Sequence, residues 1–222
     1  MQVEGPAVAE FQRLFMAGWQ RQRCAPALTG GGAAPPRARG DKAMRLVAAD
    51  PESGRSESYI ALLSAIDHAR RRAWLTYGYF VPDQGMLQAL AGAARRGIDV
   101  RLVLPGFSDF WAPFHAGRSH YDALLTAGVR ILERRDALLH AKTAVIDGVW
   151  SSVGSTNLDW RSFVHNYEAD VLVLDPAFGR EMEQLFRLDE RASHEIDLAE
   201  WRRRGLVDRL LEWLARRWAY LL

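Results

Sequence analysis

Residues 140–168, HAKTAVIDGVWSSVGSTNLDWRSFVHNYE, decide the fold and hold most of the chain's candidate chemistry. The stretch begins with His140-x-Lys142. If these residues lie on a strand, their side chains point to the same side of the sheet, because side chains alternate along a strand. Asp147 and Gly148 form a turn dipeptide shortly afterwards. The pattern therefore predicts two consecutive strands joined by a turn, with a basic pair at the start of the first.

The side chains in this stretch favour a phosphate site. Lys142 supplies positive charge, and the hydroxyl of Ser155 and the amide of Asn157 supply directed hydrogen bonds. A glycine stands just before them, so that backbone and side-chain donors can approach an anion closely. His140 is able to attack phosphorus or to deliver a proton. A buried Glu168 is suited to hold the other ring nitrogen of His140 and fix its tautomer.

The spacing resembles the HKD signature of the phospholipase D superfamily. The pattern reads His140-x-Lys142-x4-Asp147-x6-Gly154-Ser155-x-Asn157, which is far more specific than a lone His-x-Lys. The flanking segments resemble bacterial cardiolipin synthases in particular. They are LHAK at 139–142, VGSTNLD at 153–159, RSF at 161–163, NYE at 166–168, YFVPD at 79–83 and ARRGIDV at 94–100.

The resemblance implies phosphodiester chemistry that needs no metal and no cofactor. One histidine attacks phosphorus and forms a phosphohistidine, a second histidine protonates the leaving alkoxide, and an alcohol or water then enters with the reverse proton flow. The implied enzyme is a cardiolipin synthase, which transfers a phosphatidyl group between phosphatidylglycerol molecules. The implied roles are catalysis for His140, Lys142 and Glu168, phosphate binding for Lys142, Ser155 and Asn157, and structural support for Asp147 and Gly154.

Composition limits the other possibilities. The chain has 222 residues, is 49% hydrophobic and 25% charged, and carries a formal charge of +2, with no basic stripe near the motif. These values describe an ordinary globular protein and disfavour a nucleic-acid partner. Cys24 is the only cysteine, and the histidines lack metal-ligand spacing, so neither a disulfide nor a zinc site is expected. The segment around Ser155 also differs from the Gly-x-Ser-x-Gly elbow of serine hydrolases.

The chain's relation to membranes is predicted to be peripheral. No apolar run is long enough for a transmembrane helix, and the N-terminus, with Glu4 and Glu10, does not read as a signal peptide. With the resemblance, this places the chain at the cytoplasmic face of the bacterial inner membrane, acting on an anionic phospholipid. The aromatic residues of the loop at 106–117 are suited either to packing or to contact with acyl chains.

Alternating strand and helix patterns predict an α/β fold. The expected lobe is phospholipase D-like, with a mixed, mostly β-sheet core flanked by helices on both faces. Strands are predicted at 44–48, 73–80, 98–104, 129–133, 141–147, 150–153 and 167–174, and helices at 6–20, 55–71, 84–96, 118–127 and 176–189. The arginines at 70–72 are expected at the C-terminal end of their helix, where cations suit the helix dipole.

Four segments are expected along the chain. Residues 1–23 form a helix that resembles the tail of a first HKD lobe, and residues 24–43 are a flexible linker rich in Gly and Pro. Residues 44–196 form the HKD domain. Residues 197–222 form basic amphipathic helices, suited to an anionic membrane, to a partner, or to packing on the chain's own sheet.

The number of histidines raises a question of assembly. The implied mechanism needs two HKD histidines, and this sequence has one HKD motif. A homodimer would bring two copies of His140 together, as in single-motif nucleases of the superfamily. A separate chain could instead supply the first lobe. The alternatives to a cardiolipin synthase are therefore a homodimeric phosphodiesterase or nuclease and an inactive, truncated remnant that binds lipid without catalysis.

Overall fold

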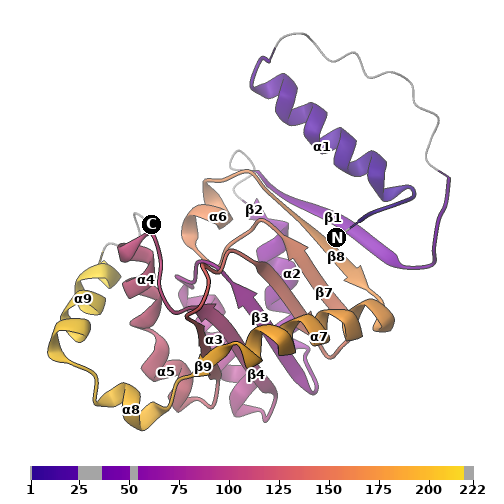
Figure 1. Cartoon of the computed structure of the whole chain (residues 1–222). Coiled ribbons are helices and arrows are strands. Elements are labelled where there is room, and N and C mark those ends of the chain that lie inside the picture. The colour runs from indigo at the N-terminus through magenta and orange to yellow at the C-terminus, as the bar shows by residue number, and fades with distance from the viewer. Residues whose placement is uncertain (1, 25–36, 51–54, 218–222) are drawn as a thin grey trace.

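The computed structural model describes residues 2–24, 37–50 and 55–217. A mixed sheet forms its centre, with the strand order β2-β1-β8-β7-β6-β3-β4-β5-β9 (Figure 1). Strand β3 is parallel to β4, and β4 to β5, while the remaining neighbours are antiparallel. The strands are β1 (Ala43–Asp50), β2 (Arg55–Ser56), β3 (Arg72–Tyr77), β4 (Asp99–Pro105), β5 (Arg130–Arg134), β6 (Lys142–Ile146), β7 (Trp150–Gly154), β8 (Glu168–Leu174) and β9 (Ser193–Glu195).

Helices cover both faces of this sheet, which confirms the predicted α/β class. One face is crossed by α7, and the other is covered by α2 and α3 (Figure 1). The main apolar core fills the space between the sheet and α2, α3 and α5. The helices are α1 (Ala7–Arg21), α2 (Glu57–Asp67), α3 (Gln84–Arg95), α4 (Trp111–Arg118), α5 (Tyr121–Thr126), α6 (Trp160–Val164), α7 (Pro176–Arg191), α8 (Leu198–Arg202) and α9 (Leu206–Arg217).

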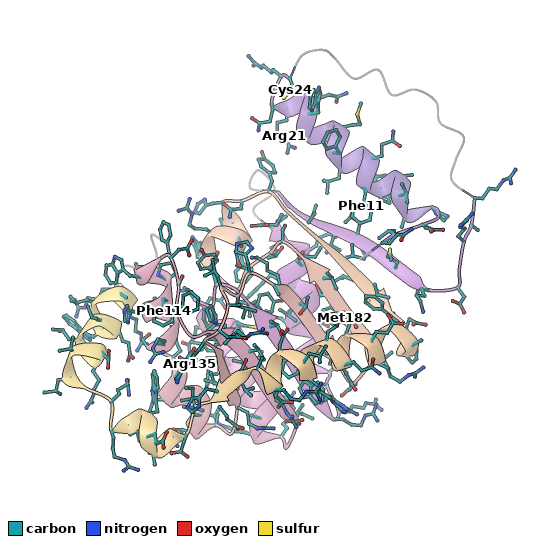
Figure 2. All side chains as sticks on the ribbon, in the orientation of Figure 1. Phe11, Arg21, Cys24, Phe114, Arg135 and Met182 are labelled. Atoms are coloured by element: carbon teal, nitrogen blue, oxygen red, sulfur yellow. The ribbon has the colours of Figure 1, made fainter. Side chains whose placement is uncertain are left out.

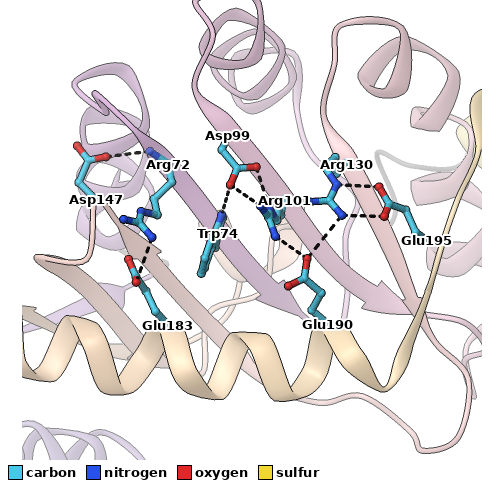
Figure 3. A network of polar contacts seen from close by, with 9 residues as sticks. All are labelled: Arg72, Trp74, Asp99, Arg101, Arg130, Asp147, Glu183, Glu190 and Glu195. Carbon is cyan, nitrogen blue, oxygen red and sulfur yellow. Dashed lines mark hydrogen bonds and ion pairs between the residues drawn. The ribbon is translucent and has the colours of Figure 1, made fainter.

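Helix α7 is tied to the sheet by ion pairs as well as by apolar packing. Its Glu183 pairs with Arg72 of β3 at 3.2 Å, and its Glu190 pairs with Arg101 of β4 at 2.7 Å (Figure 3). Both carboxylates are mostly buried, so these pairs gain more from charge attraction than exposed pairs do. The apolar side of α7 packs Phe186 on Trp74 of β3, with ring centroids 5.1 Å apart.

Two of the predicted elements require correction. The helix predicted at 55–71 ends at Asp67, so the arginines at 70–72 are not in its last turn. The backbone N–H groups of residues 70–72 donate to the Asp147 carboxylate instead of continuing the helix. The loop predicted at 106–117 contains α4, which tertiary packing against α9 stabilises. Strand β9 was not predicted, since an edge strand of three residues carries almost no sequence pattern.

The termini differ in how they attach to the lobe. Helix α1 contains no buried residue and contacts the lobe mainly along β1 (Figures 1 and 2). Most of the predicted linker at 24–43 lies outside the described residues. The predicted C-terminal segment forms two helices, α8 and α9, and α9 packs on α4 rather than on the sheet. The sheet itself runs from Ala43 to Glu195.

Candidate active site

The basic pair of the motif lies at the start of β6. His140 is exposed, whereas Lys142 is only 6% exposed, because it points inward at the first position of the strand. The Lys142 Nζ lies 2.9 Å from the His140 Nδ1 and donates a hydrogen bond to the His140 backbone oxygen at 2.8 Å. Burial lowers the pKa of Lys142, while the charges of Glu168 and Asp159 oppose that shift. The ammonium thus contacts the imidazole and feels the charges of two nearby acidic groups, Glu168 and Asp159.

The contact with Lys142 sets the chemistry that His140 offers. An ammonium only donates hydrogen bonds, so a charged Lys142 makes the Nδ1 of His140 an acceptor and places the ring proton on Nε2. In this tautomer His140 is a proton donor at Nε2. An acceptor in place of Lys142 at Nδ1 would move the proton to Nδ1 and leave the Nε2 lone pair free to attack phosphorus.

Glu168 heads a polar network next to this pair. Its Oε1 accepts hydrogen bonds from the Ser162 hydroxyl at 3.1 Å and from the Asn166 amide at 3.2 Å. The Asn157 amide nitrogen in turn donates to the Ser162 oxygen at 3.4 Å. Among the described residues, Glu168 forms no hydrogen bond with His140, because Lys142 occupies the Nδ1 side of the ring. The predicted contact between Glu168 and His140 is therefore not formed within this chain.

Asn157 presents an unsatisfied acceptor to the site. Its amide nitrogen, the atom that would donate to a phosphate oxygen, faces Ser162, and its Oδ1 is buried without a hydrogen-bond partner among the described residues. Leaving a buried acceptor unpaired costs about 1–3 kcal/mol.

Sequence reasoning missed Ser162 as the link in this network. Ser162 is fully buried at the start of α6, and its backbone N–H donates to the Asp159 carboxylate at 2.7 Å. Burial raises the pKa of Asp159, against the hydrogen bonds from Ser162. The available signal was the spacing of three between Asp159 and Ser162, which is typical of a helix N-cap.

Asp147 braces the turn between β6 and β7. It adopts a φ of 56°, and its carboxylate accepts hydrogen bonds from the backbone N–H groups of residues 70, 71 and 72 at 2.8–2.9 Å. Burial alone would raise the pKa of Asp147, but these donors and the charge of Arg71 outweigh it and lower the pKa. The contacts support the structural role expected for Asp147 and attach the motif hairpin to the start of β3.

Gly154 and the residues after it are joined closely to β8. A Cβ at position 154 would lie 1.8 Å from the Asp170 Oδ1, so only glycine fits there. Asp170 is buried and accepts hydrogen bonds from both the backbone N–H and the hydroxyl of Thr156. The Ser155 hydroxyl accepts from the Ala169 N–H at 3.0 Å. The structure therefore uses Ser155 to hold the motif loop on β8, and its place around a phosphate stays a prediction.

An aromatic residue from a neighbouring strand end completes the surroundings of His140. The Tyr79 ring lies 6.1 Å from the His140 ring and perpendicular to it, and its hydroxyl donates to the Asp109 Oδ1 at 2.9 Å. That hydrogen bond, with other local donors, lowers the pKa of Asp109. The backbone of Gly78 passes so close that a Cβ would meet the Leu139 oxygen at 2.8 Å. From the sequence, Tyr79 was noted only as part of the segment at 79–83, and no role was predicted for Asp109.

Among the cavities found in the described residues, the one that Tyr79 lines is small. It has a volume of about 20 Å³ and is lined by Gly78, Phe80, Ser108 and Arg118 among others. Such a space holds about one water molecule and cannot accept a phosphodiester.

With this geometry in hand, the chain can be compared with known proteins. The family model described as "Cardiolipin synthase, PLD-like domain" matches residues 62–189, which is more than half of the chain. The chain belongs to that family. The matched range includes the whole candidate site, from Tyr79 to Asp170.

Two curated relatives show how much of a longer protein the match represents. The chain is 36% identical over 169 residues to cardiolipin synthase 2 of Bacillus anthracis, covering 76% of this chain and 33% of that protein. It is 33% identical over 216 residues to the cardiolipin synthase of Geobacillus thermodenitrificans, covering 96% of this chain and 43% of that protein. The chain therefore spans less than half the length of these relatives.

Solved structures support the same fold. The phosphatidylserine synthase of Haemophilus influenzae superposes with a TM-score of 0.62 at 14% identity, over 83% of this chain and 47% of that one. Nuc, a phospholipase D family member from Salmonella typhimurium, superposes with a TM-score of 0.60 at 19% identity, over 70% of this chain and 99% of that one. Both confirm a phospholipase D-like lobe.

Proposed function

We propose that this chain supplies one half of the active site of a cardiolipin synthase-type phosphatidyltransferase. The observation that carries the proposal is the exposed His140, whose Nδ1 lies 2.9 Å from a buried Lys142, within a lobe of the cardiolipin synthase family. In the first step, one histidine attacks the phosphorus of phosphatidylglycerol, and the bond to glycerol breaks. Glycerol leaves with a proton from the second histidine.

The second step restores the enzyme. A hydroxyl of another phosphatidylglycerol attacks the phosphohistidine and gives its proton to the second histidine, which yields cardiolipin and the free nucleophile. In this scheme Lys142 and Asn157 hold the phosphate oxygens, with Ser155 in the same shell. Asp147 and Gly154 keep the hairpin in place. Glu168, which does not reach His140 in this chain, would instead face the histidine of the opposite lobe.

The second histidine comes from another lobe. The family relatives are more than twice as long as the chain in the two cases above, and the chain has one HKD motif. We propose that the second motif is provided either by a first HKD lobe outside this sequence, whose tail residues 1–23 resemble, or by a second copy of this chain. In both arrangements an acidic group from the opposite lobe would replace Lys142 at the Nδ1 of His140 and make the Nε2 nucleophilic.

The site is proposed to work on lipid at the cytoplasmic face of the inner membrane, as a peripheral protein. None of the helices that the structure describes is long and apolar enough to cross a bilayer. The substrate is then reached from the membrane surface, on the exposed side of His140.

The test is to incubate the 222-residue chain with phosphatidylglycerol vesicles, alone and with a first-lobe fragment of a relative. Cardiolipin and glycerol should form in equal amounts, and trapping should place the phosphoryl group on a histidine. Absence of cardiolipin in both mixtures would overturn the proposal. Light scattering on the chain alone shows whether a dimer forms. Hydrolysis of a chromogenic phosphodiester by that dimer, without lipid transfer, would identify a hydrolytic phosphodiesterase instead.

A further inference from the structure

Helix α9 is built with its apolar side facing outward. The side that packs on α4 carries Ala215, which is fully buried with Ala116 and Val81, and Glu212, which is 2% exposed and paired with Arg204 at 2.7 Å. The opposite side carries large apolar residues. Their exposed fractions are Leu206 80%, Val207 70%, Leu210 56%, Trp213 52% and Leu214 38%.

A second exposed apolar group lies on the segment that leads into the neighbouring helix α4. Phe107, Phe110 and Trp111 are 44%, 59% and 58% exposed. Since α4 and α9 pack side by side at one end of the lobe, these aromatic residues and the outer side of α9 belong to adjoining elements (Figure 1). We name the two groups together the α4–α9 surface. It gathers eight large apolar residues that are 38–80% exposed on two adjoining elements, whereas single exposed apolar residues are common on soluble surfaces.

The exposed charges of α9 are mostly positive, while Asp109 adds a negative charge on the aromatic segment. Arg209, Arg216 and Arg217 are exposed on α9, where Asp208 is the only exposed acid, and the Arg217 guanidinium lies 4.6 Å from the centre of the Trp213 ring. An apolar helix face flanked by arginine and tryptophan fits the interface of an anionic bilayer, with apolar groups in the acyl region and cations at the headgroups.

The α4–α9 surface is also connected to the candidate active site. Asp109, within the aromatic segment, binds the hydroxyl of Tyr79, and the Tyr79 ring stands against His140. Docking of this surface would therefore hold the exposed side of His140 close to the headgroups from which the substrate comes.

We propose that the α4–α9 surface docks the chain on an anionic lipid bilayer. This inference rests on the proposed lipid substrate but names the part of the chain that meets the membrane. The arginine flanks favour an anionic lipid surface over a second copy of the chain, which would bring like charges together.

The test measures vesicle binding separately from catalysis. The double variant Leu210→Gln, Trp213→Ser is compared with the control Leu185→Gln, Leu188→Gln on α7, whose leucines are 55% and 54% exposed and so match Leu210. Sedimentation uses vesicles of phosphatidylglycerol mixed with phosphatidylcholine, against phosphatidylcholine alone. We expect the α9 variant to bind mixed vesicles about tenfold more weakly or worse, and the control to bind like the parent chain.

Charge is tested in the same assay. Arg209→Gln with Arg217→Gln should weaken binding to the mixed vesicles about fivefold for each arginine removed, with no effect on phosphatidylcholine alone. Parent-like binding by the Leu210 and Trp213 variant would overturn the proposal. A lower molar mass of this variant by light scattering, together with unchanged vesicle binding, would also overturn the proposal. That result would identify a second copy of the chain as the occupant of the surface.

Failure of the proposed function gives a different result. In that case the variants still separate in vesicle binding, but no cardiolipin forms, with or without the first-lobe fragment, from vesicles or from a short-chain phosphatidylglycerol below its micelle concentration. If both proposals hold, the α9 variant loses activity on vesicles and keeps the parent activity on the short-chain lipid.

Discussion

The motif strands and helix α9 depart from ordinary burial in opposite directions. Thr156 and Ser162, between β7 and β8, and Asp170, in β8, are polar and buried, and each has hydrogen-bond partners inside the lobe. In α9, Leu206 and Leu210 are apolar and exposed, with a small alanine on the packed side. In the first region the polar groups form hydrogen bonds inside the lobe. In the second, the apolar groups stay exposed and are available for contact with a partner outside the chain.

This difference predicts two kinds of sensitivity. Substitutions in the motif region should alter the fold, the chemistry or both, because its side chains are bound to one another. Substitutions on the outer side of α9 should leave the folded chain intact and change only what it binds. Variants of the two regions should therefore differ in their stability and in their activity or binding.

Replacing His140 should have the largest effect of all. His140→Ala removes the nucleophile or proton donor, so we expect phosphatidyl transfer by the assembled enzyme to fall about 10³-fold or more. Because His140 is exposed, the free energy of unfolding should stay within about 0.5 kcal/mol. The matched control is His68→Ala, an exposed histidine outside the motif whose Nδ1 contacts the Ser64 backbone oxygen. An active His140→Ala enzyme would remove this histidine from the mechanism.

Two glycines should respond to alanine with opposite signs. Gly154→Ala places a Cβ against Asp170 and the Ala169 backbone, so we expect a loss of about 1–3 kcal/mol in the free energy of unfolding. Gly18→Ala lies inside α1 with no atom within 4 Å of the new Cβ, and should stabilise that helix by about 0.5–1 kcal/mol. Urea unfolding of both variants is the measurement. Equal effects would mean that the close packing on β8 is not a constraint.

Asp147 should make the stability of the hairpin depend on pH. Its pKa is lowered in the folded chain, so its carboxylate stabilises the fold above the ordinary pKa of about 3.9, and this contribution is lost as the pH falls through the lowered value. Asp147→Asn keeps the shape and removes the charge. We expect the parent chain to be more stable by about 1–2 kcal/mol at pH 7, with the difference shrinking below about pH 4. A difference that is constant with pH would contradict an ionic role.

The two regions also differ in how well the sequence predicted them. His140, Lys142, Asp147 and Gly154 were selected by their spacing and by the resemblance to the HKD signature, and their roles stay predictions. Strand alternation and turn chemistry, which act over a few residues, made their local structure readable from the sequence. The partners of Glu168 were not predicted. The group that lies at the Nδ1 of His140 depends on how the whole sheet places β6 and β8. Asp109 was missed for the same reason, because it reaches Tyr79 from a different loop.

Helix α9 shows a further limit of sequence reasoning. The apolar stripe of the C-terminal segment was visible in the sequence, but periodicity does not tell which side of a helix packs. Residues 218–222 of that predicted segment lie outside the described residues. In the described part, the side chosen for packing is the one with Ala215, because its small side chain lets α9 approach Ala116 of α4 closely.

The smallest effect is expected on the outer side of α9, where it can be compared directly with a substitution on the packed side. Leu210→Gln should change the free energy of unfolding by less than about 0.5 kcal/mol, because Leu210 is 56% exposed and gives up little packing. Ala215→Leu on the packed side should cost about 1–3 kcal/mol, since the larger side chain has no space between α9 and α4. Thermal unfolding compares the two, and hydrogen exchange of α9 shows whether the helix has come away from α4. If Leu210→Gln destabilises the chain as much as Ala215→Leu, the outer side of α9 is packed in solution and is not available to a membrane.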